Sequence, residues 1–243
     1  MLETLKRTYR SLPFVRRTAN RILGRRIHDP TVKIDFRFLG SSYGGWAIPL
    51  SASLGPLSTV YSFGVGLDIS FDLALIETVG CTVHGFDPTP LSAEWIERQE
   101  LPPQFKFHKV GVAAVNDDVD FFYPDNDLSH SFSKAPGPET AQRRSVKCPV
   151  RTVATLMNSL GHGVIDLCKF DIEGFEFEVL DDMIKDEIRP RILLVEYHHS
   201  VYGIPKASTY QSVKRLLSHG YEIYWVSDVG LEYGFVDARA DAG

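Results

Sequence analysis

The chain of 243 residues contains little cysteine and no long hydrophobic run. Its three cysteines, Cys81, Cys148 and Cys168, are widely spaced and lie in apolar stretches. We therefore expect buried thiols in a reducing cytoplasm, and neither a disulfide framework nor a zinc site. No apolar run approaches the roughly 20 residues that span a bilayer. The basic N-terminus also lacks the apolar stretch and small-residue cleavage site of a signal peptide.

Lys and Arg side chains are outnumbered by acidic side chains outside residues 1–28. Residues 1–28 contain eight Lys and Arg side chains and one acid, Glu3, so the rest of the chain carries 18 basic and 30 acidic side chains out of totals of 26 and 31. An acidic body repels phosphates, so we expect no nucleic-acid partner. The composition, 44% hydrophobic and 23% charged, is that of a globular protein and excludes collagen-like and wholly disordered chains.

The basic N-terminal segment has a helical pattern. Apolar residues recur at helical spacing from Leu2 to Leu12 and again after Pro13. We interpret residues 1–30 as a basic amphipathic helical arm. One interpretation is peripheral contact with the inner face of a membrane through residues 1–28, with the basic side chains toward anionic headgroups. The other is an arm that packs on the body or on a second subunit.

Beyond the arm, short apolar strands alternate with helical patterns. The expected strands are rich in β-branched and aromatic residues and lie at 58–63, 81–86, 105–110, 165–171, 191–197, 221–226 and 231–236. Such alternation predicts an α/β domain with a mostly parallel sheet and helices on both faces. The last two strands follow each other without a helix and predict an antiparallel pair. We place the domain at 31–236, with an insertion or lid at about 116–149 and a frayed tail at 237–243.

A glycine turn lies between the first of these strands and the following helix. Gly64 and Gly66 allow a ligand to approach the backbone, and the start of the helix offers unpaired N–H groups. A dinucleotide fingerprint needs a third glycine near Ile69, and none is present. The pattern therefore disfavours a nicotinamide dinucleotide. A tight turn without a ligand is the alternative.

Asp87 ends the next strand, about twenty residues after the glycine turn. A carboxylate at this place can accept hydrogen bonds from both hydroxyls of an adenosine ribose. The alternative is a carboxylate that caps the following helix.

Two carboxylates lie at the end of another expected strand, at 165–171. One strand ends in Asp171, and the chain continues through Glu173 into an amphipathic helix. Both carboxylates are expected at the carboxyl edge of the sheet, where buried charges are costly unless they are paired or functional. We interpret Lys169 as the ion-pair partner of a neighbouring carboxylate.

From Lys169 to Leu180 the sequence reads KFDIEGFEFEVL. This stretch resembles the FkbM-type methyltransferases, which depend on S-adenosylmethionine, in a branch of methyltransferase-like proteins. The glycine motif at 60–72, the pair Asp87-Pro88 and the turn at 110–113 match in the same order. The resemblance covers roughly residues 38–236. It implies a class I methyltransferase fold, which is a Rossmann-like seven-stranded sheet.

The resemblance also implies S-adenosylmethionine as cofactor and methyl transfer to a hydroxyl oxygen of a sugar, a glycolipid or a natural product. The cofactor contacts that it implies are Ser62, Phe63, Gly64, Gly66, Asp68, Asp87, Pro88, Val112 and Asp171. The sequence departs from the family pattern at the glycine turn, where Ser62 replaces the usual acid and Asp68 the usual third glycine. Both residues stay open as the ligand of the cofactor's amino-acid moiety.

An alcohol is scarcely ionised at neutral pH, so a hydroxyl acceptor benefits from a general base. The expected catalytic residues are Asp171, Glu173 and His198. Our first interpretation needs no metal and assigns the base to His198. The alternative is a divalent metal, Mg, Mn or Fe, held by Asp171, Glu196 and His198. Glu196 and His198 can share one side of their strand, while His199 points elsewhere.

Two other functions are compatible with the same architecture. One is a nicotinamide-dependent oxidoreductase, which the incomplete glycine fingerprint disfavours. The other is a non-catalytic module that keeps the S-adenosylmethionine fold and is tethered to a membrane or a partner. The acids Asp87, Asp171 and Glu173 argue against it, because a degenerate site has no reason to keep buried charges. Trp46 is interpreted as part of the core, with a wall of the cofactor pocket as the alternative.

Overall fold

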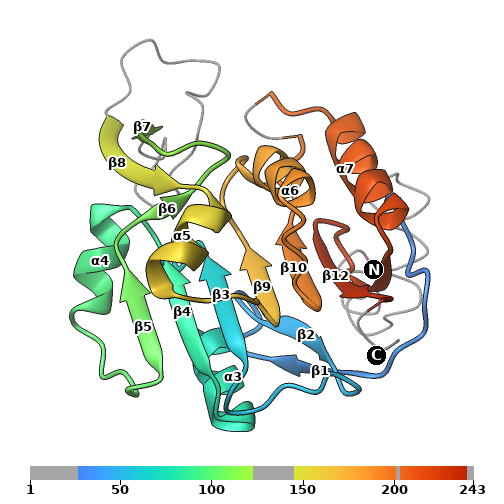
Figure 1. The fold of residues 1–243 in the computed structure, drawn as a ribbon, viewed down its shortest axis with the longest axis horizontal. Helices are drawn as coiled ribbons and strands as arrows, with labels where there is room; N and C mark the ends of the chain where they lie inside the picture. The colour runs from blue at the N-terminus through green and yellow to red at the C-terminus, as the bar shows by residue number, and fades with distance from the viewer. Residues whose placement is uncertain (1–26, 123–144, 201–202, 240–243) are drawn as a thin grey trace, which may run out of the picture.

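The computed structural model describes residues 27–122, 145–200 and 203–239. Its centre is a seven-stranded sheet with the strand order β11-β12-β10-β9-β3-β4-β5 (Figure 1). The strands are β3 (Thr59–Phe63), β4 (Thr82–Phe86), β5 (Phe105–His108), β9 (Leu167–Phe170), β10 (Ile192–Glu196), β11 (Tyr221–Val226) and β12 (Glu232–Asp237). Strand β12 is antiparallel to β10 and β11, and the other pairings are parallel. The predicted Rossmann-like sheet with its C-terminal antiparallel pair is confirmed.

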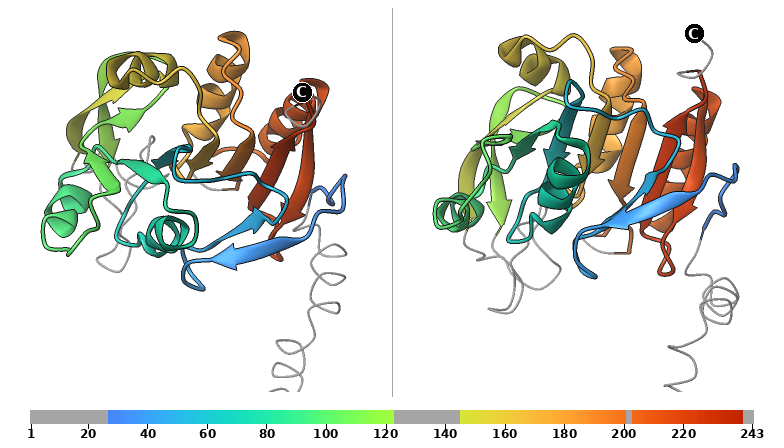
Figure 2. Two further views of the ribbon diagram at one scale, coloured as in Figure 1. Left: turned by 60° about the horizontal axis from the view of Figure 1, so that its bottom comes forward. Right: turned by 90° about the horizontal axis from the view of Figure 1, so that it is seen from below.

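Helices cover both faces of this sheet, as predicted (Figure 2). One face carries α5 (Val153–Leu160), α6 (Glu176–Lys185) and α7 (Lys206–Ser218), and the other carries α3 (Ser70–Val79) and α4 (Pro90–Ile96). Neighbouring strand residues point to opposite faces, so each face has its own core. Tyr61 belongs to the core under α6 and α7, and its neighbour Val60 belongs to the core under α3.

Local sequence signals explain where the helices beside the site begin. The Thr89 side chain caps α4, because it accepts a hydrogen bond from the backbone N–H of Ser92. Helix α6 has Glu176 and Glu178 in its first turn and Lys185 in its last. These charges are favourable at the positive and negative ends of the helix dipole.

A hairpin precedes the sheet in the chain. It consists of β1 (Phe36–Leu39) and β2 (Trp46–Pro49), which pair antiparallel. The sequence did not predict it, since two four-residue strands are too short to show a clear alternation. Trp46 is buried in the core with α3, as interpreted.

The region predicted as an insertion contains strands at both ends. A three-stranded sheet is formed by β6 (Gly111–Val112), β7 (Asp117–Phe122) and β8 (Ser145–Arg151) in the order β6-β8-β7. Residues 123–144, where the predicted lid is centred, lie outside the described residues. Cys148 of β8 is buried, as are Cys81 and Cys168, and all three are free thiols as predicted.

The two ends of the chain are only partly described. Most of the predicted arm, residues 1–26, lies outside the described residues, and so do residues 240–243 of the predicted tail. The tail begins later than predicted, because Asp237 is the last residue of β12 and its carboxylate lies 2.7 Å from the Arg189 guanidinium. None of the helices in the described ranges is both long and apolar enough to cross a membrane.

Candidate functional site

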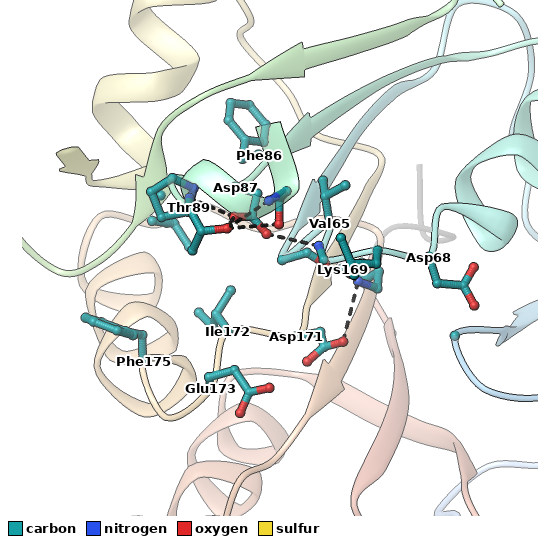
Figure 3. A pocket seen from close by; sticks show the side chains of 18 of the residues that line it. Val65, Asp68, Phe86, Asp87, Thr89, Lys169, Asp171, Ile172, Glu173 and Phe175 are labelled. Carbon is teal, nitrogen blue, oxygen red and sulfur yellow. Dashed lines mark hydrogen bonds and ion pairs between the residues drawn. The ribbon is translucent and has the colours of Figure 1, made fainter. Parts of the chain in front are cut away.

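A cavity of about 570 Å³ lies at the carboxyl ends of β3, β4 and β9 (Figure 3). This volume falls in the range of about 300–1,000 Å³ that is usual for small-molecule sites. Of the predicted site residues, those that line it are Gly64, Gly66, Asp68, Asp87, Pro88, Val112, Asp171 and Glu173. The structure therefore brings most of the predicted residues to one place, at the crevice beyond the strand ends.

The glycine turn packs directly against the end of β9. Gly64 has a φ of +81°, and a Cβ atom there would lie 1.7 Å from the carbonyl oxygen of Asp171, so a larger residue does not fit. The backbone N–H of Asp171 donates to the Phe63 carbonyl at 3.0 Å. Lys169 Nζ donates to the Gly64 carbonyl at 2.9 Å and lies 3.9 Å from Asp171 Oδ2. The predicted ion pair of Lys169 is present, and the same ammonium holds the turn.

Asp87 links the glycine turn to the start of α4. One carboxylate oxygen accepts a hydrogen bond from the backbone N–H of Gly66 at 3.0 Å. The other accepts from the backbone N–H and the hydroxyl of Thr89, at 2.9 and 2.6 Å. A carboxylate has about four lone-pair positions, so about one is left for a ligand hydroxyl. The helix cap itself is Thr89, which Asp87 holds in place.

Two predicted cofactor contacts lie away from the cavity. Phe63 is fully buried, and its ring stacks on Phe86 and Phe170 with centroid distances of 4.8 and 5.1 Å. Ser62 is also fully buried and faces the other side of the sheet, toward Asp72 of α3. Neither side chain lines the cavity, because Phe63 packs between the aromatic rings of the neighbouring strands and Ser62 points to the opposite face of the sheet.

Asp68 lines the cavity, but the protein itself engages its carboxylate. Oδ1 accepts a hydrogen bond from the backbone N–H of Ser70 at 2.8 Å, and Oδ2 accepts one from the Ser41 hydroxyl at 2.6 Å. Burial opposes ionisation, but these hydrogen bonds and the charge of Lys169 outweigh it and lower the pKa of Asp68. In Figure 3 the carboxylate points away from Asp171. Asp68 therefore joins two loops, and its role as a ligand of the cofactor stays a prediction.

Asp171 and Glu173 form the side of the cavity opposite Asp87 (Figure 3). Glu173 has a φ of +51° and Gly174 one of +103°, so the turn after β9 passes through the left-handed region twice. A non-glycine residue in this region stores strain, which is common at functional sites. Glu176 stabilises the turn: its fully buried carboxylate accepts a hydrogen bond from the backbone N–H of Gly174 at 2.8 Å.

His198 lies among three carboxylates just beyond β10. Its Nε2 is 3.4 Å from Glu173 Oε2 and 3.7 Å from Asp171 Oδ1, and its Nδ1 is 3.5 Å from Glu176 Oε1. Burial lowers the pKa of His198, but the hydrogen bond with Glu176 and the charges of Glu173 and Asp171 outweigh burial and raise it to about 10. An imidazole that is protonated at neutral pH cannot accept a proton. The raised pKa therefore disfavours His198 as the base, and this role stays a prediction.

Glu196 completes this cluster at the end of β10. Burial and then the charge of Asp171 raise the pKa of Glu196 to about 8. The three residues of the predicted metal site lie close together. Asp171, Glu196 and His198 each offer one ligand atom, and these atoms lie within 4.8 Å of one another. His199 points elsewhere, as predicted, and its Nδ1 is hydrogen-bonded with Thr209 Oγ1 at 2.9 Å.

Residues 64–223 match the family model of the methyltransferase FkbM domain. The chain belongs to the FkbM methyltransferase family. It is similar to the probable methyltransferase-like protein 24 of Homo sapiens, with 28% identity over 158 residues, and to that of Rattus norvegicus, with 27% over 158 residues. These matches cover 64% of this chain and 37% of each relative, so the chain spans less than half of their length. A solved structure, the METTL16 MTase domain, is similar with a TM-score of 0.42 and 12% identity, over 92% of this chain and 79% of that one.

The sequence did not reveal two contributors to this methyltransferase site. Glu176 is an acid on the buried face of α6, three residues before Val179, and that position in the helical pattern was a usable signal. Tyr43 and Gly44 line the cavity from the turn between β1 and β2. This turn lies before the family match begins, and its Gly44-Gly45-Trp46 stretch, which contributes to the resemblance, did not point to a site residue.

Proposed function

We propose that this FkbM-family protein transfers a methyl group from S-adenosylmethionine to a hydroxyl oxygen of a sugar, a glycolipid or a natural product. The observation that supports this is the distribution of carboxylates around one cavity. Asp87 lies on one side with the glycine turn, and Asp171 and Glu173 lie on the other (Figure 3). Such a cavity has one end for a nucleoside and another for a group that loses a proton.

The residues of the cavity fit S-adenosylmethionine. Gly66 offers open backbone, since a Cβ atom there would meet nothing within 4 Å. Asp87 keeps a lone-pair position for a ribose hydroxyl, and Val65, Val112 and Phe121 give the cavity an apolar wall suited to adenine. When bound, this cofactor supplies an electrophilic methyl group on a sulfonium.

Among the residues that the structure describes, Asp171 is the best-placed general base. Its side chain is 35% exposed and lines the cavity, so an acceptor hydroxyl can reach it. In the proposed reaction Asp171 accepts the hydroxyl proton as the oxygen forms its bond to the methyl group and the sulfur–methyl bond breaks. The His198 imidazolium stabilises the negative charge of the cluster from 3.7 Å. A positioned base contributes about 10²–10⁴-fold, and alignment of the reactants contributes up to about 7–11 kcal/mol.

The test combines labelled S-adenosylmethionine with a panel of glycosides, macrolides and lipids, and scores methylated products by mass. We expect Asp171→Asn to lower turnover about 10²–10⁴-fold while calorimetry shows little change in cofactor affinity. Glu178→Gln, at an exposed position of the neighbouring helix α6, is the matched control. Wild-type turnover in Asp171→Asn would remove the base assignment. Transfer only to amines would remove the hydroxyl acceptor.

A metal-assisted version of the reaction is the second candidate, because Asp171, Glu196 and His198 can bring ligand atoms together. Oxygen and nitrogen ligands suit Mg, Mn or Fe. If a chelator abolishes activity and added Mg²⁺ or Mn²⁺ restores it, the metal replaces Asp171 as the activating group. Full activity in the chelator supports the metal-independent reaction.

The oxidoreductase alternative fits the cavity less well. Asp68 and Asp87 place two carboxylates at the glycine turn where a dinucleotide would put its negatively charged pyrophosphate. Preferential binding of NADH over S-adenosylmethionine in calorimetry would reverse this conclusion. Binding of S-adenosylmethionine without transfer to any acceptor would favour the non-catalytic module.

A further inference from the structure

The turn between β1 and β2 forms part of the cavity wall although it lies outside the family match. Tyr43 and Gly44 of this turn line the same cavity as Asp171 and Glu173. The family model begins at residue 64, which also lines the cavity. The hairpin therefore contributes to the site although the family model does not include it.

The Ser41 hydroxyl fixes the conformation of this turn. It accepts hydrogen bonds from the backbone N–H groups of Tyr43 at 3.1 Å and Gly44 at 2.9 Å, and it donates one to Asp68 Oδ2 at 2.6 Å. A hydroxyl has one donor and two acceptor positions, so all three are used. A fourth bond runs from the Ser41 backbone N–H to the Ser70 hydroxyl at 2.7 Å.

Close packing adds to these hydrogen bonds. A Cβ atom on Gly44 would lie 2.9 Å from the carboxyl carbon of Asp68, and one on Gly45 would lie 2.4 Å from the Ser41 carbonyl oxygen. The turn is thereby pinned to the loop that begins α3. A pinned turn loses little conformational entropy when a ligand binds to it.

This anchored turn presents an exposed ring. The Tyr43 side chain is 90% exposed and yet belongs to the cavity wall. A free aromatic face beside carboxylates that accept hydrogen bonds suits a ring that has apolar C–H groups and several hydroxyls.

We propose that Tyr43 and the pair Asp171 and Glu173 form an acceptor subsite for a sugar ring. The Tyr43 ring stacks on the C–H face of the sugar, and the two carboxylates accept hydrogen bonds from its hydroxyls. Asp68 and Ser41 are positioning residues that hold Tyr43 at the cavity. This inference rests on the proposed function, because it names the class of its acceptor.

The test is saturation-transfer NMR on the full chain loaded with S-adenosylhomocysteine, with methyl hexopyranosides and methyl deoxyhexopyranosides as probes. We expect the ring C–H protons of at least one glycoside to receive saturation from the wild type. Tyr43→Ala should weaken that glycoside about three- to tenfold, the scale of one aromatic contact. Tyr43→Phe should retain the affinity, because it keeps the ring.

Two serine variants separate positioning from general disruption. Ser41→Ala removes the anchor and should weaken the glycoside as Tyr43→Ala does, while the affinity for S-adenosylhomocysteine stays unchanged. Ser42→Ala, at the exposed neighbouring position, should behave as the wild type. Equal glycoside affinity in Tyr43→Ala and the wild type would overturn the proposal.

The acceptor class and the cofactor are decided by different readouts. If S-adenosylhomocysteine binds but no glycoside receives saturation, the sugar subsite is overturned and the cofactor site stands. If the glycoside signal depends on Tyr43 but S-adenosylhomocysteine does not bind, the subsite stands and the proposed methyl transfer fails.

An octyl glycoside below its micellar concentration tests whether the sugar ring is recognised as part of a glycolipid. Equal binding of the methyl and octyl forms shows that the ring alone is recognised, and octyl-only binding that survives Tyr43→Ala overturns the proposal.

Discussion

The Asp87 carboxylate accepts a hydrogen bond from the backbone N–H of Gly66, which precedes it by 21 residues in the chain. This bond joins the turn after β3 to the turn after β4. A ligand that contacts the glycine turn therefore meets a backbone whose position depends on the same carboxylate that faces the ligand.

The first prediction concerns this carboxylate. Asp87→Ala should weaken the binding of S-adenosylmethionine by about 1.5–3 kcal/mol, the range for hydrogen bonds to a charged group. Calorimetry on variants with native circular dichroism measures the effect. Asp118→Ala, at an exposed position of β7, is the control. An unchanged dissociation constant would remove Asp87 from the cofactor site.

The second prediction concerns the protonation of His198. Its pKa is raised from 6.5 to about 10 in the folded protein, so the fold binds this proton more tightly than the unfolded chain does. The resulting stabilisation is fully present below pH 6.5 and is lost as the pH rises toward 10. The unfolding free energies of the wild type and His198→Gln should therefore converge between these pH values in denaturant titrations. A difference that grows with pH contradicts the protonated imidazole.

The third prediction concerns two histidines at the edge of the sheet. His84 Nδ1 and His108 Nε2 are hydrogen-bonded at 3.0 Å. Burial, then the neighbouring His108 and His162, lowers the pKa of His84 to about 4. Here the unfolded chain binds more protons than the fold, so stability should fall as the pH drops from 6.5 toward 4. His84→Asn should flatten this dependence in urea titrations, and His219→Asn, at an exposed helix end, should not.

The fourth prediction concerns the contact between the glycine turn and β9. Gly64→Ala should destabilise the fold by roughly 2–5 kcal/mol, because the added carbon strikes the Asp171 carbonyl and the backbone is left-handed. Gly163→Ala has open space around the added carbon and should change stability by less than about 1 kcal/mol. Equal melting temperatures of the two variants would show that the ends of β3 and β9 can move apart with little loss of unfolding free energy.

The fold was largely predictable, because each strand of the large sheet is an apolar run bounded by turn residues. The main errors were at strand ends, for example 105–110 against the observed Phe105–His108. The β1–β2 hairpin was not predicted, because its position depends on contacts between residues far apart in the sequence. One example is the hydrogen bond from the Tyr224 hydroxyl to the Ala47 carbonyl. Short strands of this kind are specified by packing rather than by periodicity.

The site was predictable in position but not in protonation. Asp87 was found from its spacing after the glycine turn, and Asp171 from its place at a strand end and the family resemblance, because strand ends carry the ligand residues of such sheets. The charge of His198 depends on Glu173 and Glu176, which come from another strand end and a helix and approach the imidazole within 3.5 Å only in the fold. Ser62 and Phe63 do not line the cavity, because the direction of a strand side chain depends on the packing of the folded sheet and not on its place in a motif.

The hydrogen bonds of the β1–β2 turn have a consequence for protein engineering. They run through the Ser41 side chain and the backbone at Tyr43 and Gly44, and they make no use of the Tyr43 ring. The side chain at position 43 can therefore be changed to any residue that keeps its backbone N–H without loss of these hydrogen bonds. If the proposed sugar subsite is correct, a saturation library at this single codon should change which acceptors bind and leave the hydrogen bonds of the turn in place.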